Sequence, residues 1–179
     1  MRTIDRVRRR ISIQIMNLHV ILEKVSAAET KAARVELLKQ HNSLALRDIL
    51  KGGFDDTIEF DLPKGVPPFE TNVSNEGFTP TALSRVTPNI AYFVKGHPKS
   101  VPLKPARRER MFLEILEGIP KDEAELVLAM KEKKLQRRYK GLTKDVVVAA
   151  FPGLMDASKQ KKADVKVVEP IQQEQPPAA

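Results

Sequence analysis

The sequence predicts a mainly helical protein of about six short helices, with a small two-stranded β element and proline-rich loops. Three observations lead to this fold class. Apolar residues recur at helical spacing in two long stretches, capping residues and glycines bound those stretches, and prolines gather between them. Hydrophobic residues make up 41% of the 179 residues, which is enough for a hydrophobic core.

We expect one mostly helical domain over residues 16–156. Its helical parts are 16–53 and 106–155, and a strand and loop segment, 54–105, joins them. Residues 157–179 consist largely of Lys, Gln, Glu, Pro and Ala, which predicts a disordered tail. Residues 1–15 form an arginine-rich extension with three open interpretations: a basic arm that orders on nucleic acid, a mitochondrial presequence, or residues before a true start at Met16.

The first helical part reads as three helices. An apolar stripe marks the first of them, formed by Leu18, Ile21, Leu22 and Val25. Ser26, in a capping-box spacing with Glu29, or Thr30 opens the second, and Asn42 or Ser43 opens the third. Gly52 and Gly53 are expected to end the third helix, because glycine adopts the left-handed cap conformation without steric cost.

The middle of the chain predicts the β element. Ile58, Phe60 and Leu62 alternate with polar residues, which is the period of a half-buried strand. A second strand is expected over Ile90–Lys95 and can pair with the first. Between them, Pro63–Pro88 reads as a long loop.

The second helical part predicts three more helices, over 106–117, 120–135 and 143–151. Pro105 fits the entrance of the first, and Thr143 fits the N-cap of the third. Acidic residues in the first turn of the middle helix and lysines in its last turn complement the helix dipole.

We expect no enzymatic activity, no cofactor, no metal site and no small-molecule substrate. The sequence contains no cysteine and three histidines, and it lacks a phosphate-binding glycine loop. No apolar run approaches the roughly 20 residues of a membrane span, so no membrane partner is expected.

Positive charge instead predicts a polyanionic partner. The formal net charge is +8, and the densest basic run lies near the end of the middle helix. A basic loop containing a tyrosine can hold a phosphate backbone and stack on a base. The predicted nucleic-acid-binding residues are Arg107, Arg108, Lys131, Lys134, Arg137, Arg138, Tyr139, Lys140 and Lys144. Solvated lysines and arginines, and a tyrosine packed on the core, are the alternative interpretation.

Several separated motifs also resemble one family. The sharpest are Pro67-Pro68, Phe93-Val94-Lys95-Gly96 and Phe151-Pro152-Gly153-Leu154, within a stretch that covers residues 16–155. This stretch resembles small uncharacterised proteins of T-even-like contractile-tailed phages, notably those of marine bacteria. Residues 1–15 and the length of the tail after Met155 depart from that pattern. The resemblance implies a phage-encoded protein made in the host cytoplasm, and it supplies no site residues.

Two classes of function follow. The first is a non-catalytic accessory protein that binds nucleic acid or a replication or transcription complex, which the basic run favours. The second is a virion-associated or assembly protein that acts as an interaction module, which the proline-rich loops and the tail favour.

Overall fold

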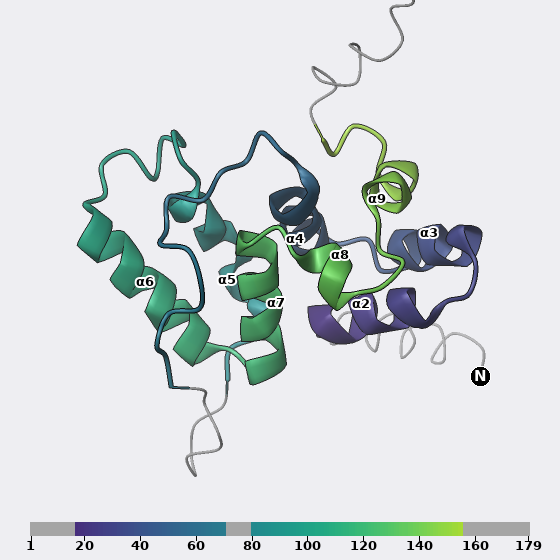
Figure 1. Cartoon of the computed structure of the whole chain (residues 1–179), viewed down its shortest axis with the longest axis horizontal. Coiled ribbons are helices and arrows are strands. Elements are labelled where there is room, and N and C mark those ends of the chain that lie inside the picture. The colour runs from purple at the N-terminus through teal and green to yellow at the C-terminus, as the bar shows by residue number, and fades with distance from the viewer. Residues whose placement is uncertain (1–16, 71–79, 156–179) are drawn as a thin grey trace, which may run out of the picture.

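The computed structural model describes residues 17–70 and 80–155, and helices dominate this part of the chain (Figure 1). The α-helices are α2 (Leu18–Ala27), α3 (Lys31–Gln40), α4 (Leu44–Phe54), α5 (Leu83–Val86), α6 (Pro105–Gly118), α7 (Lys121–Lys131), α8 (Leu135–Arg138) and α9 (Lys144–Ala150). A 3-10 helix, η1, covers Thr87–Phe93. The prediction of a mainly helical fold is confirmed. The predicted extension at 1–15 and tail at 157–179 lie outside the described residues.

Hydroxyl side chains begin three of the helices, as the sequence predicts. Thr30 caps α3 by accepting a hydrogen bond from the Ala33 amide at 3.2 Å. Ser43 caps α4 through the Leu46 amide, also at 3.2 Å, and Thr143 caps α9 through the Val146 amide at 3.4 Å. Each cap satisfies an amide that has no partner within its own helix.

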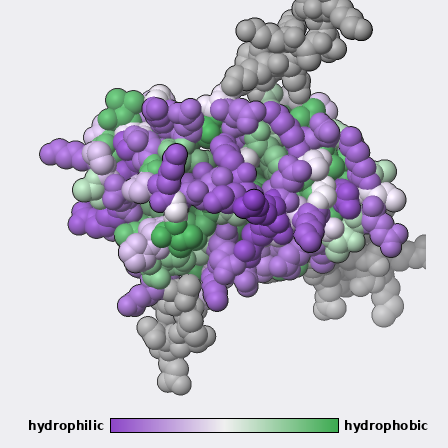
Figure 2. Space-filling view, viewed as in Figure 1, coloured by the Kyte–Doolittle hydropathy of each residue, from purple (hydrophilic) through white to green (hydrophobic). Residues whose placement is uncertain are grey.

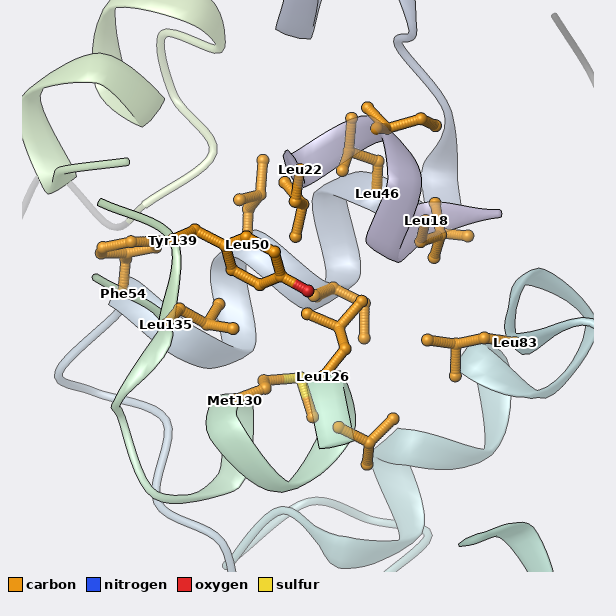
Figure 3. Packing of buried hydrophobic residues seen from close by; sticks show 14 of the residues in the cluster. Leu18, Leu22, Leu46, Leu50, Phe54, Leu83, Leu126, Met130, Leu135 and Tyr139 are labelled. Atoms are coloured by element: carbon orange, nitrogen blue, oxygen red, sulfur yellow. The ribbon is translucent and has the colours of Figure 1, made fainter. Parts of the chain in front are cut away.

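The helices form two groups with α4 and α8 between them (Figure 1). At one end, α9 and α2 both pack on α3. At the other, α6 packs on α7, and η1 packs on α5 and α6. Because α4 contacts α7 and α2 contacts α7, one hydrophobic core runs through both groups. Figure 3 shows its centre, where Leu22, Leu50 and Leu126 come from three different helices.

Gly52 and Gly53 do not end α4, in contrast to the prediction. Both are helical residues of α4, which continues to Phe54. A larger residue would not fit at either position, because side chains of α7 and α8 lie against both glycines. A Cβ atom on Gly53 would lie 2.2 Å from Cδ1 of Leu135, and one on Gly52 would lie 2.7 Å from the Met130 sulfur. The glycines therefore allow α4 to approach the end of α7 closely.

The predicted two-stranded β element is also wrong. Among the described residues, the two segments meet only at an isolated antiparallel bridge between Phe60 and Val94. The Asp61 amide donates to the Phe93 carbonyl and the Lys95 amide to the Glu59 carbonyl, both at 2.8 Å. The prediction that these two segments pair with each other was right. The second segment is not a strand, because Pro88 starts a helical turn and most of the segment belongs to η1.

A buried carboxylate joins the starts of three helices. Glu123 lies in the first turn of α7 and is 1% exposed. Its Oε1 accepts a hydrogen bond from the Leu18 amide at 3.1 Å, and its Oε2 accepts one from the Leu83 amide at 2.8 Å. These amides begin α2 and α5, where an N-terminus has unpaired N–H groups and a partial positive charge. The charge of Glu123 is therefore stabilised inside the core.

Candidate nucleic-acid interface

The basic segment, defined as residues 131–144, contains seven Lys or Arg residues and one acidic residue. It runs from the end of α7 through α8 to the start of α9. Two tight turns shape it. Lys133 adopts a left-handed conformation, with φ of 57°, and the Lys134 amide donates back to the Ala129 carbonyl at 2.8 Å. This pattern is a Schellman motif, and it ends α7 four residues before the predicted boundary at 135.

The second turn lies at Gly141, whose φ is 84°. A Cβ atom there would lie 2.5 Å from Cζ of Arg34, so the guanidinium of α3 occupies the space beside the glycine. The Ser26 hydroxyl at the end of α2 donates to the Lys140 carbonyl at 2.9 Å. The turn is thus held against the α2–α3 pair, and α9 begins directly after it.

The side chain of Lys131 is buried and forms hydrogen bonds within the protein. It is 4% exposed. The Nζ group donates to the carbonyls of Pro63 and Gly65, at 2.7 and 3.0 Å, and to the carboxylate of Glu132 at 2.6 Å. These bonds fix the 63–65 loop on α7. The prediction that Lys131 contacts nucleic acid is therefore wrong, because its amine has no access to a phosphate.

Lys133 was absent from the predicted set and has a comparable role. Its Nζ group donates to the Asp55 carbonyl at 2.8 Å and to the Gly52 carbonyl, both at the end of α4. Cations stabilise this end of a helix. Burial lowers the pKa of Lys133, and the nearby carboxylates of Asp55 and Asp56 oppose that shift. A lysine that caps a helix distant in sequence leaves no local pattern that would reveal it.

Tyr139 cannot stack on a base. It is 3% exposed and lies in the hydrophobic core beside Leu50 and Leu135 (Figure 3). Burial raises the pKa of its hydroxyl, and the neighbouring Arg138 opposes the shift. The prediction of a stacking tyrosine is wrong, and the alternative of a core tyrosine is correct.

Three other cations of the basic segment form ion pairs. Arg138 contacts Glu125 at 2.6 Å, Lys144 contacts Asp56 at 2.8 Å, and Lys134 contacts Glu132 at 3.4 Å. Each cation remains partly accessible. Arg137 and Lys140 are exposed, and neither forms an ion pair with another residue of the described ranges 17–70 and 80–155.

The two predicted arginines of α6 do not join this surface. Arg108 is 5% exposed and pairs with Asp61, and its guanidinium also donates to the carbonyls of Ser100 and Leu103. Arg107 is exposed, but it lies at the start of α6, across the molecule from α8 (Figure 1). Packing of α6 on α7 therefore does not bring the arginine-bearing end of α6 to α8.

A second basic area was missed entirely. The α4–α9 groove, of about 630 Å³, is lined by Lys39, Asn42, Leu44, Arg47, Asp48 and Lys51 on one side and by Ala150, Phe151, Pro152, Gly153 and Leu154 on the other. Its three cations come from the end of α3 and from α4. They are four or more residues apart in the sequence, so they form no basic run.

Within residues 17–70 and 80–155, no group of three or more His, Cys, Asp or Glu side chains is placed to hold a metal ion. The helices of these residues are all too short or too polar to cross a membrane. The face seen in Figure 2 is mostly hydrophilic, with separate apolar patches.

Comparison with known proteins gives one match. The model of DUF6433, a family of unknown function, matches residues 21–137. The chain belongs to this family. No curated protein and no solved structure matches it. The DUF6433 match contains α3 to α7 and the α4 side of the groove, and it ends at Arg137. Lys140, Lys144 and α9 lie beyond it.

Proposed function

We propose that this DUF6433 protein is a non-catalytic accessory protein that binds the phosphate backbone of nucleic acid through α8 and its flanking turns. The observation that supports this most directly is the pair Arg137 and Lys140. Both are exposed and lack an ion pair within the described structure, in a segment with seven basic residues and one acidic residue. Lys134, Arg138 and Lys144 lie in the same segment and are partly accessible.

Such a surface recognises the negative charge of the phosphate backbone and not the base sequence. Lysine and arginine side chains neutralise phosphates and release counterions, which supplies affinity without base recognition. Because Tyr139 is buried, this surface offers no aromatic platform for unstacked bases. We therefore expect duplex and single-stranded nucleic acid to bind with similar affinity, and neither with strong sequence preference.

The salt dependence of binding tests this proposal. Each phosphate neutralised on duplex DNA contributes about 0.9 to the slope of log K against log salt. Replacing Arg137 and Lys140 together by Ala should shallow the slope by about two units. Fluorescence anisotropy with a labelled duplex over a salt series measures it.

The matched control is Lys104→Ala with Arg110→Ala. This pair removes the same charge from the N-cap and the first turns of α6, away from α8 (Figure 1), and Arg110 there lies 4.0 Å from Glu114. The control should leave the slope unchanged. Equal slopes for the wild type and the Arg137 and Lys140 variant, or no binding at low salt, would refute the proposal.

The resemblance to proteins of contractile-tailed phages supports a role in the cytoplasm of an infected bacterium. A virion-associated or assembly role is the second candidate, and the partly apolar α4–α9 groove favours it because apolar surface suits a protein partner. Mass spectrometry of purified virions separates the two: an accessory protein should be absent from particles, and a structural component should be present in stoichiometric amount.

A further inference from the structure

The α4–α9 groove joins two segments that lie about 100 residues apart in the sequence. Arg47, in the first turns of α4, places its guanidinium over the ring of Phe151, 5.3 Å from its centre. Its Nε donates to the Asn42 side chain at 2.8 Å. These two contacts hold the guanidinium at the wall of the groove, so the site is shaped before any partner arrives.

The groove has a net positive lining. Lys39, Arg47 and Lys51 contribute three cations, and Asp48 is the one acidic residue among the residues that line it. None of the three cations forms an ion pair of 4.0 Å or less with another described residue, unlike Lys134, Arg138 and Lys144 of the basic segment. They are therefore available to carboxylates or phosphates of a partner.

Apolar groups lie between these cations. Leu44 is 73% exposed, and it is one of three large hydrophobic residues so exposed in the described structure. Ala150, Pro152 and Leu154 face the same groove. An exposed leucine next to three cations suits a partner that combines negative charge with an aliphatic or aromatic side chain.

A nucleic acid fits this groove less well. Phe151 is 7% exposed, and Arg47 covers its ring, so the ring has no free face for a base. A phosphate backbone also has no group that gains from burying Leu44. An acidic peptide can use both features of the groove, because carboxylates meet the cations while an apolar side chain covers the leucine.

We propose that the α4–α9 groove docks an acidic peptide segment of a partner protein, with an apolar anchor residue seated against Leu44. The proposal is independent of nucleic-acid binding by the basic segment, which shares no lining residue with the groove. With this groove the protein has a second binding surface and can join a protein partner to a nucleic acid.

The test uses the full chain and three synthetic peptides. The first is rich in Asp and Glu and contains two Leu residues, the second has Ser in place of both Leu residues, and the third has Lys in place of the acidic residues. Fluorescence anisotropy measures affinity, and amide shifts in two-dimensional NMR locate the site. The first peptide should bind and shift the amides of Leu44, Arg47, Lys51 and Leu154. The second should bind more weakly, and the third should not bind.

Variants on one helix supply a matched comparison. Lys39→Glu changes a groove cation at the end of α3 and should weaken the first peptide about tenfold, which corresponds to about 1.4 kcal/mol. Lys31→Glu makes the same change at the start of α3, outside the groove, and should have little effect. Both residues are exposed, so neither variant disturbs the core. Leu44→Ser should also weaken the first peptide and should leave the second unchanged.

Three results would overturn the proposal. The first is that the Leu-containing acidic peptide does not bind, or that Lys39→Glu and Lys31→Glu weaken its binding equally. The second is a duplex or single-stranded oligonucleotide that shifts the groove amides while the peptide does not. The third is sedimentation showing that the chain dimerises through Leu44, which would make a second copy the occupant of the groove.

Discussion

The basic segment and the α4–α9 groove carry positive charge in opposite ways. The segment concentrates seven cations in 14 residues of sequence, yet Lys131 and Lys133 bind carbonyl groups of distant loops and helices, and three others contact carboxylates. The groove draws its three cations from a less charged stretch. None of them forms an ion pair of 4.0 Å or less within the described structure, and Lys51 interacts electrostatically with Asp48. Most of the dense charge is thus used within the protein, and of the seven cations only Arg137 and Lys140 are exposed without an ion pair in the described structure.

The internal use of cations in the basic segment has a physical cause. A lysine at the end of a helix lies near carbonyl groups without partners, its own or those of a neighbouring helix, and its ammonium can satisfy several of them at once. The basic segment follows the end of α7 and crosses the end of α4, so it meets many such groups. Lys39 and Lys51 of the groove also lie in the last turns of α3 and α4, yet neither forms an ion pair of 4.0 Å or less within the described residues.

The largest expected effect tests the internal use of Lys131. Lys131→Met should lower the free energy of unfolding by about 2–3 kcal/mol, because it leaves the Pro63 and Gly65 carbonyls without their charged donor. Lys134→Met removes the same charge from a side chain that is 55% exposed, and it should cost less than about 0.5 kcal/mol. Urea unfolding followed by circular dichroism measures both. Equal small effects would show that the Lys131 amine is free, and the comparison above would fail.

A smaller effect separates the two roles of Lys133, its left-handed turn and its contact with α4. Lys133→Ala should destabilise the protein, because the carbonyls of Gly52 and Asp55 lose their donor while the strained turn remains. Lys133→Gly loses the same bonds but adopts positive φ without steric cost, so it should be about 1 kcal/mol more stable than the alanine variant. Thermal unfolding of the pair measures the difference. An alanine variant as stable as the glycine variant would contradict the left-handed turn.

The smallest effect concerns the carboxylate of the groove. Burial raises the pKa of Asp48 above 3.8, and Lys51 partly offsets this. A raised pKa means that the folded state binds this proton more tightly than the unfolded state does. At pH values above the folded pKa, the ionised carboxylate therefore lowers the free energy of unfolding. Asp48→Asn should therefore raise the melting temperature slightly at neutral pH, and the gain should vanish as pH falls toward 3.8.

Melting curves over a pH series measure this gain. Glu29→Gln, at an exposed position between α2 and α3, controls for the loss of one negative charge. A gain at Asp48 that is the same at all pH values, or one matched by Glu29→Gln, would show that burial of the carboxylate is not its cause.

The sequence predicted the features that local chemistry determines. Thr143 was predicted as an N-cap and Ser43 was one of two predicted caps with Asn42, because a cap depends on residues three positions away. The apolar stripe of α2 follows from helical spacing. The exposed pair Arg137 and Lys140 was within the predicted set for the same reason, since a basic run is visible in the sequence.

Several of the errors involve partners that are distant in sequence. Gly53 reads as a helix stop, and its actual role is to make room for Leu135. Lys131 reads as surface charge until the chain 66 and 68 residues earlier is placed against it. The α4–α9 groove needs α3, α4 and α9 to meet, and no local pattern carries that information.

The hydrogen bond between Glu123 and the Leu18 amide affects the order in which the protein can fold during its synthesis. The amide that begins α2 belongs to Leu18, and the carboxylate that accepts its hydrogen bond lies 105 residues later. At an elongation rate of about 5–20 residues per second, roughly 5–20 seconds separate the synthesis of the two. During that interval the nascent α2 has its apolar face but not its acceptor or the surface of α7. The start of α2 therefore gains its buried acceptor only after α7 has been synthesised.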